Sequence, residues 1–213
     1  MFTRSAGGET MANNMAKKTN GNIRAGGTGE TPAHLRFREV SHEEHRELRD
    51  ILLGLISAFE TCNLKGASKL FSQFCNHTGP HFRYEEETLH PLLERILGRV
   101  QVEHLNCEHD RAIVDAIYLG KLTSAKRLGE DQARQGKRLV RRILPHVSDC
   151  DGLAVMVEMM SEAQVETILA ARESALKDNV ALLEWASKVR PRSFRDTYQR
   201  DYYATRRQAR GYG

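Results

Sequence analysis

Apolar residues recur at helical spacing along most of the chain. The first clear stripe, after Ser41, consists of Leu48, Leu52, Leu55 and Phe59. Residues three or four positions apart share one face of an α-helix, so this stripe predicts an amphipathic helix. Ser41 and Glu44 have the spacing of a capping box, in which each side chain bonds to the other residue's backbone. We therefore expect the first helix to begin at Ser41.

Similar spacing predicts four more helices. They cover residues of about 67–97, 100–118, 124–146 and 161–189. Gly79 and Pro80 interrupt the second helix and should kink or restart it just ahead of His81, because proline removes a backbone donor. No segment has the alternating pattern of a β-hairpin. The predicted fold class is therefore all-α, an up-down four-helix bundle with an additional C-terminal helix.

Composition changes at both ends of the chain. Residues 1–35 are rich in small and polar residues, which cannot bury enough apolar area to become ordered. From Lys188 onward, eight Lys and Arg stand against two Asp. We therefore predict a disordered leader over 1–35, the bundle over 36–160, the additional helix over 161–189 and a basic disordered tail over 190–213.

The cysteines and the hydropathy pattern indicate a cytoplasmic protein. The four cysteines stand far apart with no CxxC pair, at Cys62, Cys75, Cys107 and Cys150. This spacing excludes a zinc finger and is typical of reduced thiols. No apolar run approaches the 18 or so residues of a membrane span, and the N-terminus lacks the apolar core of a signal peptide. We expect no contact with a membrane.

Two pairs of histidines stand in similar sequence contexts. "EEHRELRDIL" around His45 resembles "CEHDRAIVDAI" around His109, and "GPHFRYEEE" around His81 resembles "LPHVSDCDG" around His146. His45 and His81 are 36 residues apart, and His109 and His146 are 37 residues apart, so two histidine pairs of the same design follow one another. In an up-down bundle the four imidazoles are expected to face one interior from four different helices.

An acid follows the second histidine of each pair. Glu85 comes four residues after His81, and Asp151 comes five residues after His146 because Cys150 occupies the fourth position. A residue five positions on reaches the same face only where the helix is widened or ends. Four imidazoles and two carboxylates suit iron, manganese or zinc, and two ions bridged by both acids would use all six.

The other histidines are expected to lie on the surface or to cap helices. They are His34, His42, His77, His90 and His104.

The residues that carry this pattern resemble the hemerythrin-like HHE cation-binding family. The resemblance covers about Phe37 to Gly152, and its motifs are "EHR", "HFRYEEETLHP", "EHDR" and "HVSDCD". It implies a bundle holding a non-haem di-iron centre, oxo- or hydroxo-bridged, that binds dioxygen or related small molecules. The implied iron ligands are His45, His81, Glu85, His109, His146 and Asp151, with Glu85 and Asp151 bridging.

One position departs from the oxygen-carrying members of that family. They have two histidines four residues apart on the third helix, whereas Leu105 and Ile113 flank His109 here. Unless His104 moves in, one iron position is open to water, peroxide or nitric oxide. The departure favours redox chemistry, sensing, or handling of reactive oxygen and nitrogen species over oxygen carriage alone.

Two other interpretations stay open. A ferritin-like carboxylate bundle would need Glu-x-x-His on two helices, and "EVSH" at Glu39 and "ETLH" at Glu87 fit that motif, though both fall in the first half. Alternatively, the bundle serves iron storage or sensing, or is a regulatory interaction module whose Arg- and Tyr-rich tail docks a protein partner. The tail alone does not predict nucleic acid as a partner. The fifth helix is expected to cover the bundle or to form a homodimer face.

Overall fold

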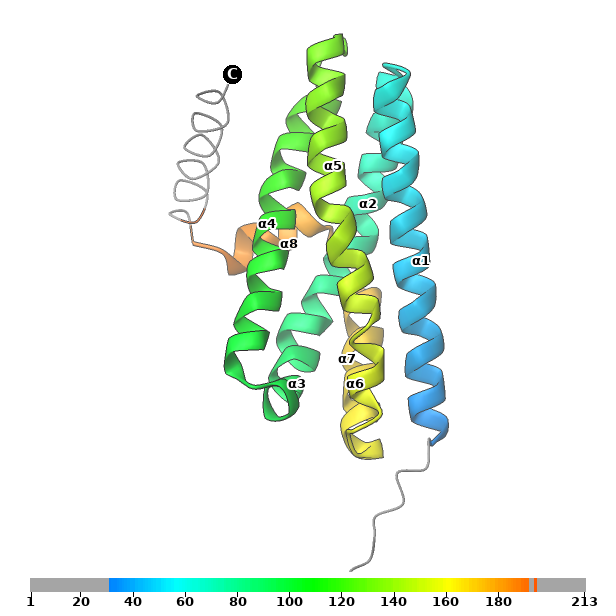
Figure 1. Ribbon diagram of the computed structural model, residues 1–213, viewed down its shortest axis with the longest axis vertical. Helices are drawn as coiled ribbons and strands as arrows, with labels where there is room; N and C mark the ends of the chain where they lie inside the picture. The colour runs from blue at the N-terminus through cyan, green and yellow to red at the C-terminus, as the bar shows by residue number, and fades with distance from the viewer. Residues whose placement is uncertain (1–30, 192–193, 195–213) are drawn as a thin grey trace, which may run out of the picture.

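The computed structural model describes residues 31–191 and residue 194, and all regular structure among them is helical. Four long segments form the bundle: α1 (Pro32–Glu60), α2 (Leu64–Tyr84), α4 (Arg99–Thr123) and α5 (Glu130–Asp151). α1 packs against α2 and α5, and α4 packs against the same two helices, so the four close into a ring (Figure 1). The predicted all-α bundle is confirmed. None of the described helices is long and apolar enough to cross a membrane.

The second bundle helix changes its winding without a break. After α2 the chain forms one π-helical stretch, η1 (Glu85–Leu89), and continues as α3 (His90–Leu97). The backbone N–H of His90 donates to the Glu85 carbonyl, which is the bond of a π-helical turn. Such turns occur mostly as single insertions within α-helices and are frequent at functional sites.

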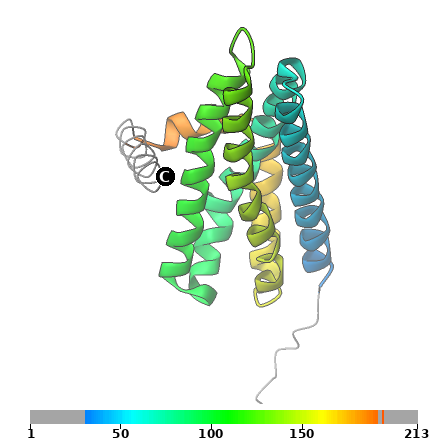
Figure 2. The same ribbon diagram turned by 45° about the horizontal axis from the view of Figure 1, so that its top comes forward.

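Between α5 and residue 191, the described chain forms three shorter helices, α6 (Ala154–Val157), α7 (Glu162–Asp178) and α8 (Leu182–Val189). α7 lies along α1 and α2, and α8 packs on α2 and α4. Figure 1 shows α7 behind the lower part of α5 and α8 crossing behind α4, and Figure 2 gives a second view of both. The predicted single fifth helix is thus divided in two. Asn179 adopts the left-handed conformation at φ 47° and ends α7, as is common at helix C-termini.

The predicted start of the first helix is wrong. α1 begins at Pro32 after the N-cap Thr31, whose hydroxyl lies 2.7 Å from His34 Nδ1. Proline is favoured at the first helical position because its missing N–H would have no partner there. Ser41 is instead buried within α1. The predictions for the leader up to residue 30, and for nearly all of the tail, lie outside the described residues.

The buried apolar residues form two clusters with a layer of histidines between them. On α1, Phe37 belongs to one cluster and Leu48 to the other, and His45 stands between them. On α4, His109 likewise lies between Leu105 of the one cluster and Ala112 of the other. The core is therefore interrupted by polar side chains halfway along the bundle.

Gly79 lets the connection between α7 and α8 approach α2 closely. A Cβ atom at this position would collide with the backbone of residues 180–182. Pro80, which follows, lies within α2, and the helix continues through it. The close approach of a neighbouring segment therefore gives Gly79 a role beyond the predicted kink.

We expect Gly79→Ala to destabilise the fold by about 1–3 kcal/mol, the usual cost of overpacking a core. The matched control is Gly54→Ala, since Gly54 is also helical and its added methyl would meet only the Leu70 side chain, at 3.2 Å. Because alanine has the higher helix propensity, the control should stay within about 1 kcal/mol of wild type. Urea unfolding of both variants measures the difference. Equal stabilities would contradict the role given to Gly79.

Candidate metal centre

Four of the buried histidines are held by the same ring nitrogen. The Nδ1 of His45 donates to the Ser41 carbonyl at 2.7 Å, and the Nδ1 of His81 lies 3.0 Å from Glu44 Oε2. Nδ1 of His109 lies 2.9 Å from a Glu86 oxygen. Nδ1 of His90 lies 2.7 Å from the amide oxygen of Asn106. An Nδ1–H bonded in this way fixes the tautomer and leaves the lone pair on Nε2, the arrangement of metal-binding histidines.

Glu85 lies between two of these rings. One carboxylate oxygen is 3.3 Å from His81 Nε2, and the other is 3.1 Å from His109 Nε2. The residue is 1% exposed and comes from the start of η1, while His81 and His109 come from α2 and α4. One carboxylate therefore faces a different imidazole with each of its oxygens.

Several atoms of this cluster have no hydrogen-bond partner although they are buried. They are Nε2 of His45, His90 and His109, and Oε2 of Glu85. The last two lie 3.1 Å apart but are not aligned for a hydrogen bond. An unpaired buried polar group costs about 1–3 kcal/mol. Cations bound beside these atoms would satisfy them, so the donor set fits a metal centre.

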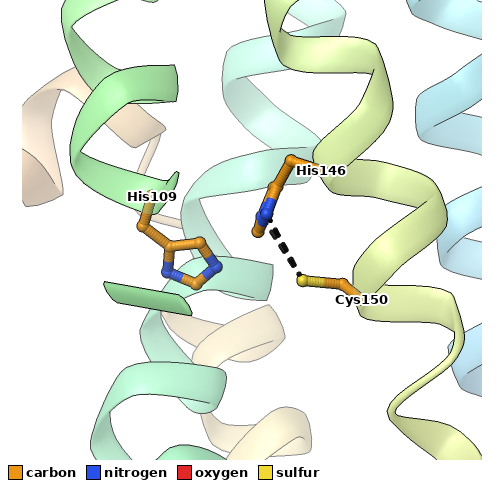
Figure 3. Close-up of side chains that lie close together, drawn as sticks. All are labelled: His109, His146 and Cys150. Carbon is orange, nitrogen blue, oxygen red and sulfur yellow. Dashed lines mark hydrogen bonds between the residues drawn. The ribbon is translucent and has the colours of Figure 1, made fainter. Parts of the chain in front are cut away.

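Cys150 stands beside His146 on the last turn of α5. Its sulfur lies 3.5 and 3.4 Å from the two ring nitrogens of His146, and Figure 3 shows both side chains beside His109. The sulfur is also within 4.8 Å of ligand atoms of His45 and Glu85. The thiol of Cys150 therefore lies close to candidate ligands from α1, η1 and α5.

Asp151 is the one predicted ligand that the structure leaves outside the cluster. Its side chain is 38% exposed, accepts a hydrogen bond from His42 Nδ1, and approaches His45 only at 3.9 Å from Nδ1. Because α5 is α-helical up to its end, the residue four positions after His146 shares its face and the residue five positions after does not. The structure brings together His45, His81, Glu85, His109 and His146.

Sequence reasoning missed His90, which is fully buried rather than on the surface. The π-helical bond between Glu85 and His90 places these residues one turn apart on one face, and both lie close to His109. A fifth imidazole is therefore present, and it comes from α3 rather than from the positions that flank His109 on α4. His104 is 58% exposed and lies beside Glu108, away from the centre.

Burial and neighbouring charges set the proton occupancy of the cluster. Burial lowers the pKa of His146 to about 3, and the charge of His109 adds to that effect. Burial acts in the same direction on His81 and His109, but the carboxylates beside them outweigh it and raise their pKa. Burial alone would raise the pKa of Glu85, but the same two histidines hold it well below its ordinary value. His146 is therefore neutral, with a lone pair available to a metal.

The space beside the centre is small and mostly apolar. A cavity of about 10 Å³ touches His45, His81, His146 and Cys150 and is otherwise walled mainly by apolar side chains. This volume is close to the minimum that holds one water molecule. Only a very small molecule could occupy it without movement of the walls.

The ferritin-like alternative fails in the described part of the chain. Glu39 and Glu87, which fit its Glu-x-x-His motif, are both exposed. Glu87 pairs with Arg83 on the surface. Neither carboxylate is available to a buried metal pair.

Comparison with known proteins gave one match. A family model, described as the Hemerythrin HHE cation binding domain, matches residues 37–158, which is more than half of the chain. No curated protein and no solved structure matched the chain. The matched residues include every candidate ligand described above.

Proposed function

Because the chain belongs to the hemerythrin HHE cation-binding family, we propose that its bundle holds two non-haem iron ions that bind dioxygen, peroxide or nitric oxide. The carrying observation is the position of Glu85 between the Nε2 atoms of His81 and His109. Iron in such a centre would supply the electrons that a bound oxygen or nitrogen species accepts. The residues around it hold the ions and limit what reaches them.

The distances at Glu85 support a bridge between two ions. Two donors that each lie about 2.1 Å from one ion, at a right angle, are about 3 Å apart. The separations of 3.3 and 3.1 Å between Glu85 oxygens and the two Nε2 atoms are close to this value. We infer that His45 and His81 would hold one ion, and that His109, His90 and His146 would hold the second.

Cys150 directly precedes Asp151, which was predicted as the second bridging ligand, and its thiol lies among the other candidate ligands. It adjoins His45 and Glu85 on one side and His109 and His146 on the other. We therefore infer that Cys150 contributes sulfur to the centre, and that Asp151 does not bind the metal.

Variants of these two neighbours test that assignment. We expect Cys150→Ser to lower iron affinity about tenfold, at the low end of what a lost ligand or its support costs, and to remove any sulfur-to-iron absorption band. Asp151→Asn should leave the iron affinity and the absorption band unchanged, because Asp151 lies outside the cluster. The reverse result would restore Asp151 as the ligand.

The small apolar cavity beside the centre supports a diatomic or similarly small ligand. Larger substrates would have to displace buried side chains such as Phe82, whose ring stacks on His109 at a centroid distance of 3.7 Å. Its apolar walls would also limit the access of water to a bound species.

The proposal is tested by elemental analysis of anaerobically purified protein, with absorption spectra before and after exposure to air, peroxide or nitric oxide. We expect two irons per chain and a new near-ultraviolet band with at least one of these reagents. One ion or none per chain, even after reconstitution with ferrous iron, would contradict the di-iron centre.

A further inference from the structure

Two arginines that follow the matched family domain contact carboxylates next to the candidate centre. Arg172 lies on α7, and Arg190 directly follows α8. Their side chains are only 17% and 16% exposed. Each binds a carboxylate that itself contacts the Nδ1 atom of a proposed iron ligand.

The first of these connections runs from Arg172 to His81. Nε and Nη2 of Arg172 lie 2.8 and 2.7 Å from Glu44 Oε1. The other oxygen of Glu44 faces His81 Nδ1 at 3.0 Å and accepts the Tyr84 hydroxyl at 3.1 Å. The arginine therefore occupies one oxygen and leaves the second for the histidine.

The second connection runs from Arg190 to His109. Nη1 and Nη2 of Arg190 donate to the two oxygens of Glu86 at 2.9 and 2.7 Å, and Nε donates to Asp110 at 2.7 Å. Glu86 in turn lies 2.9 Å from His109 Nδ1. Such a two-point contact fixes the plane of the carboxylate as well as its charge.

The carboxylates depend on these arginines because they are largely buried. Glu44 and Glu86 are only 13% and 14% exposed in their side chains. A buried carboxylate that loses its cationic partner also loses the contacts that hold its orientation. The acceptor that orients the imidazole would then be free to turn away.

We propose that Arg172 and Arg190 are positioning residues of the metal centre, each acting on one ligand histidine through one carboxylate. This inference rests on the proposed function. Outer partners that hold Nδ1–H orient the ring and strengthen the donation from Nε2 to a metal. α7 and α8 thereby complete the centre, one for each proposed ion, in addition to covering the bundle.

The test uses full-length Arg172→Gln and Arg190→Gln, with Arg83→Gln as the matched control. Arg83 also joins α2 to α7, through Asp178 at 2.7 Å, but its carboxylate partners contact no candidate ligand. Nitrogen NMR of the imidazoles in metal-free protein reports ring tautomer and hydrogen bonding. Iron loss to a chelator reports retention of the loaded centre.

We expect Arg172→Gln to shift the nitrogen signals of His81 alone and Arg190→Gln those of His109 alone. Each should release iron about tenfold faster, in the range found for outer partners of metal ligands. Arg172→Lys, which keeps the charge but not the two contacts, should lie between Arg172→Gln and wild type. Arg83→Gln should change neither readout.

Wild-type histidine signals and iron retention in both glutamine variants would overturn the inference. So would equal effects of Arg83→Gln, because a general loosening of α7 would then explain them. If the wild-type chain binds no iron, the proposed function fails, and the nitrogen signals of the metal-free variants still decide whether the arginines position the rings.

Discussion

Replacing Glu85 with alanine is expected to release both iron ions, because this carboxylate faces one proposed ligand of each. His81 Nε2 and His109 Nε2 lie 3.3 and 3.1 Å from its two oxygens. Loss of a ligand shared by two ions should weaken each of them, whereas loss of one histidine removes a donor from only one. Elemental analysis should give less than one iron per chain.

Two further variants make this result specific. Glu85→Gln keeps the size of the side chain but not its charge, so iron should be lost without a change in the fold. Glu87→Ala removes an exposed carboxylate from the same π-helical turn and should retain two irons. If Glu85→Ala and Glu85→Gln both kept two irons per chain, the bridge would be disproved.

Removal of iron by a chelator is expected to lower the melting temperature of the wild-type protein by about 10 °C. A ligand at about 1,000 times its Kd stabilises the folded state by about 4 kcal/mol. In a chain of this size, each kcal/mol of stability shifts the melting temperature by about 2–4 °C. Metal removal also leaves the buried Nε2 atoms of His45, His90 and His109 unpaired. Scanning calorimetry with and without chelator measures the shift.

Surface and centre variants should respond differently to the chelator. His104→Ala should behave like wild type, because His104 is 58% exposed and outside the cluster. Glu85→Ala should melt at the same temperature with or without chelator. A wild-type melting temperature unaffected by complete iron loss would show that the bundle does not depend on its metal.

The histidine pairs were predictable because helical periodicity and duplication both act over short stretches of sequence. His45, His81, His109 and His146 each stand on a stripe of apolar residues, and the structure gathers all four. The start of α1 was not predictable in the same way, since Ser41 and Thr31 both have capping partners three residues on. Tertiary packing favours the earlier start, because Ala33 and Phe37, which precede Ser41, are buried in the apolar core.

The parts that escaped prediction depend on helix winding and on distant packing. His90 would lie on another face if residues 85–89 were α-helical, and no local sequence rule marks a π-helical turn. Similarly, Cys150 rather than Asp151 lies beside the candidate ligands, because α5 keeps its ordinary winding to its last residue. Arg172 and Arg190 lie 128 and 104 residues from the carboxylates they bind, beyond the reach of any periodicity.

The π-helical turn also changes which neighbours one continuous helical rod can have. Before the turn, α2 packs against α1, α4, α7 and α8; after it, α3 packs against α4 and α6. Each residue of an α-helix advances the side-chain direction by about 100°, so one residue more in a turn rotates everything beyond it by that angle. One continuous helix can therefore place Glu85 and His90 on the same face, toward the candidate centre, and then bury a different face in α3. No loop is needed between the two parts.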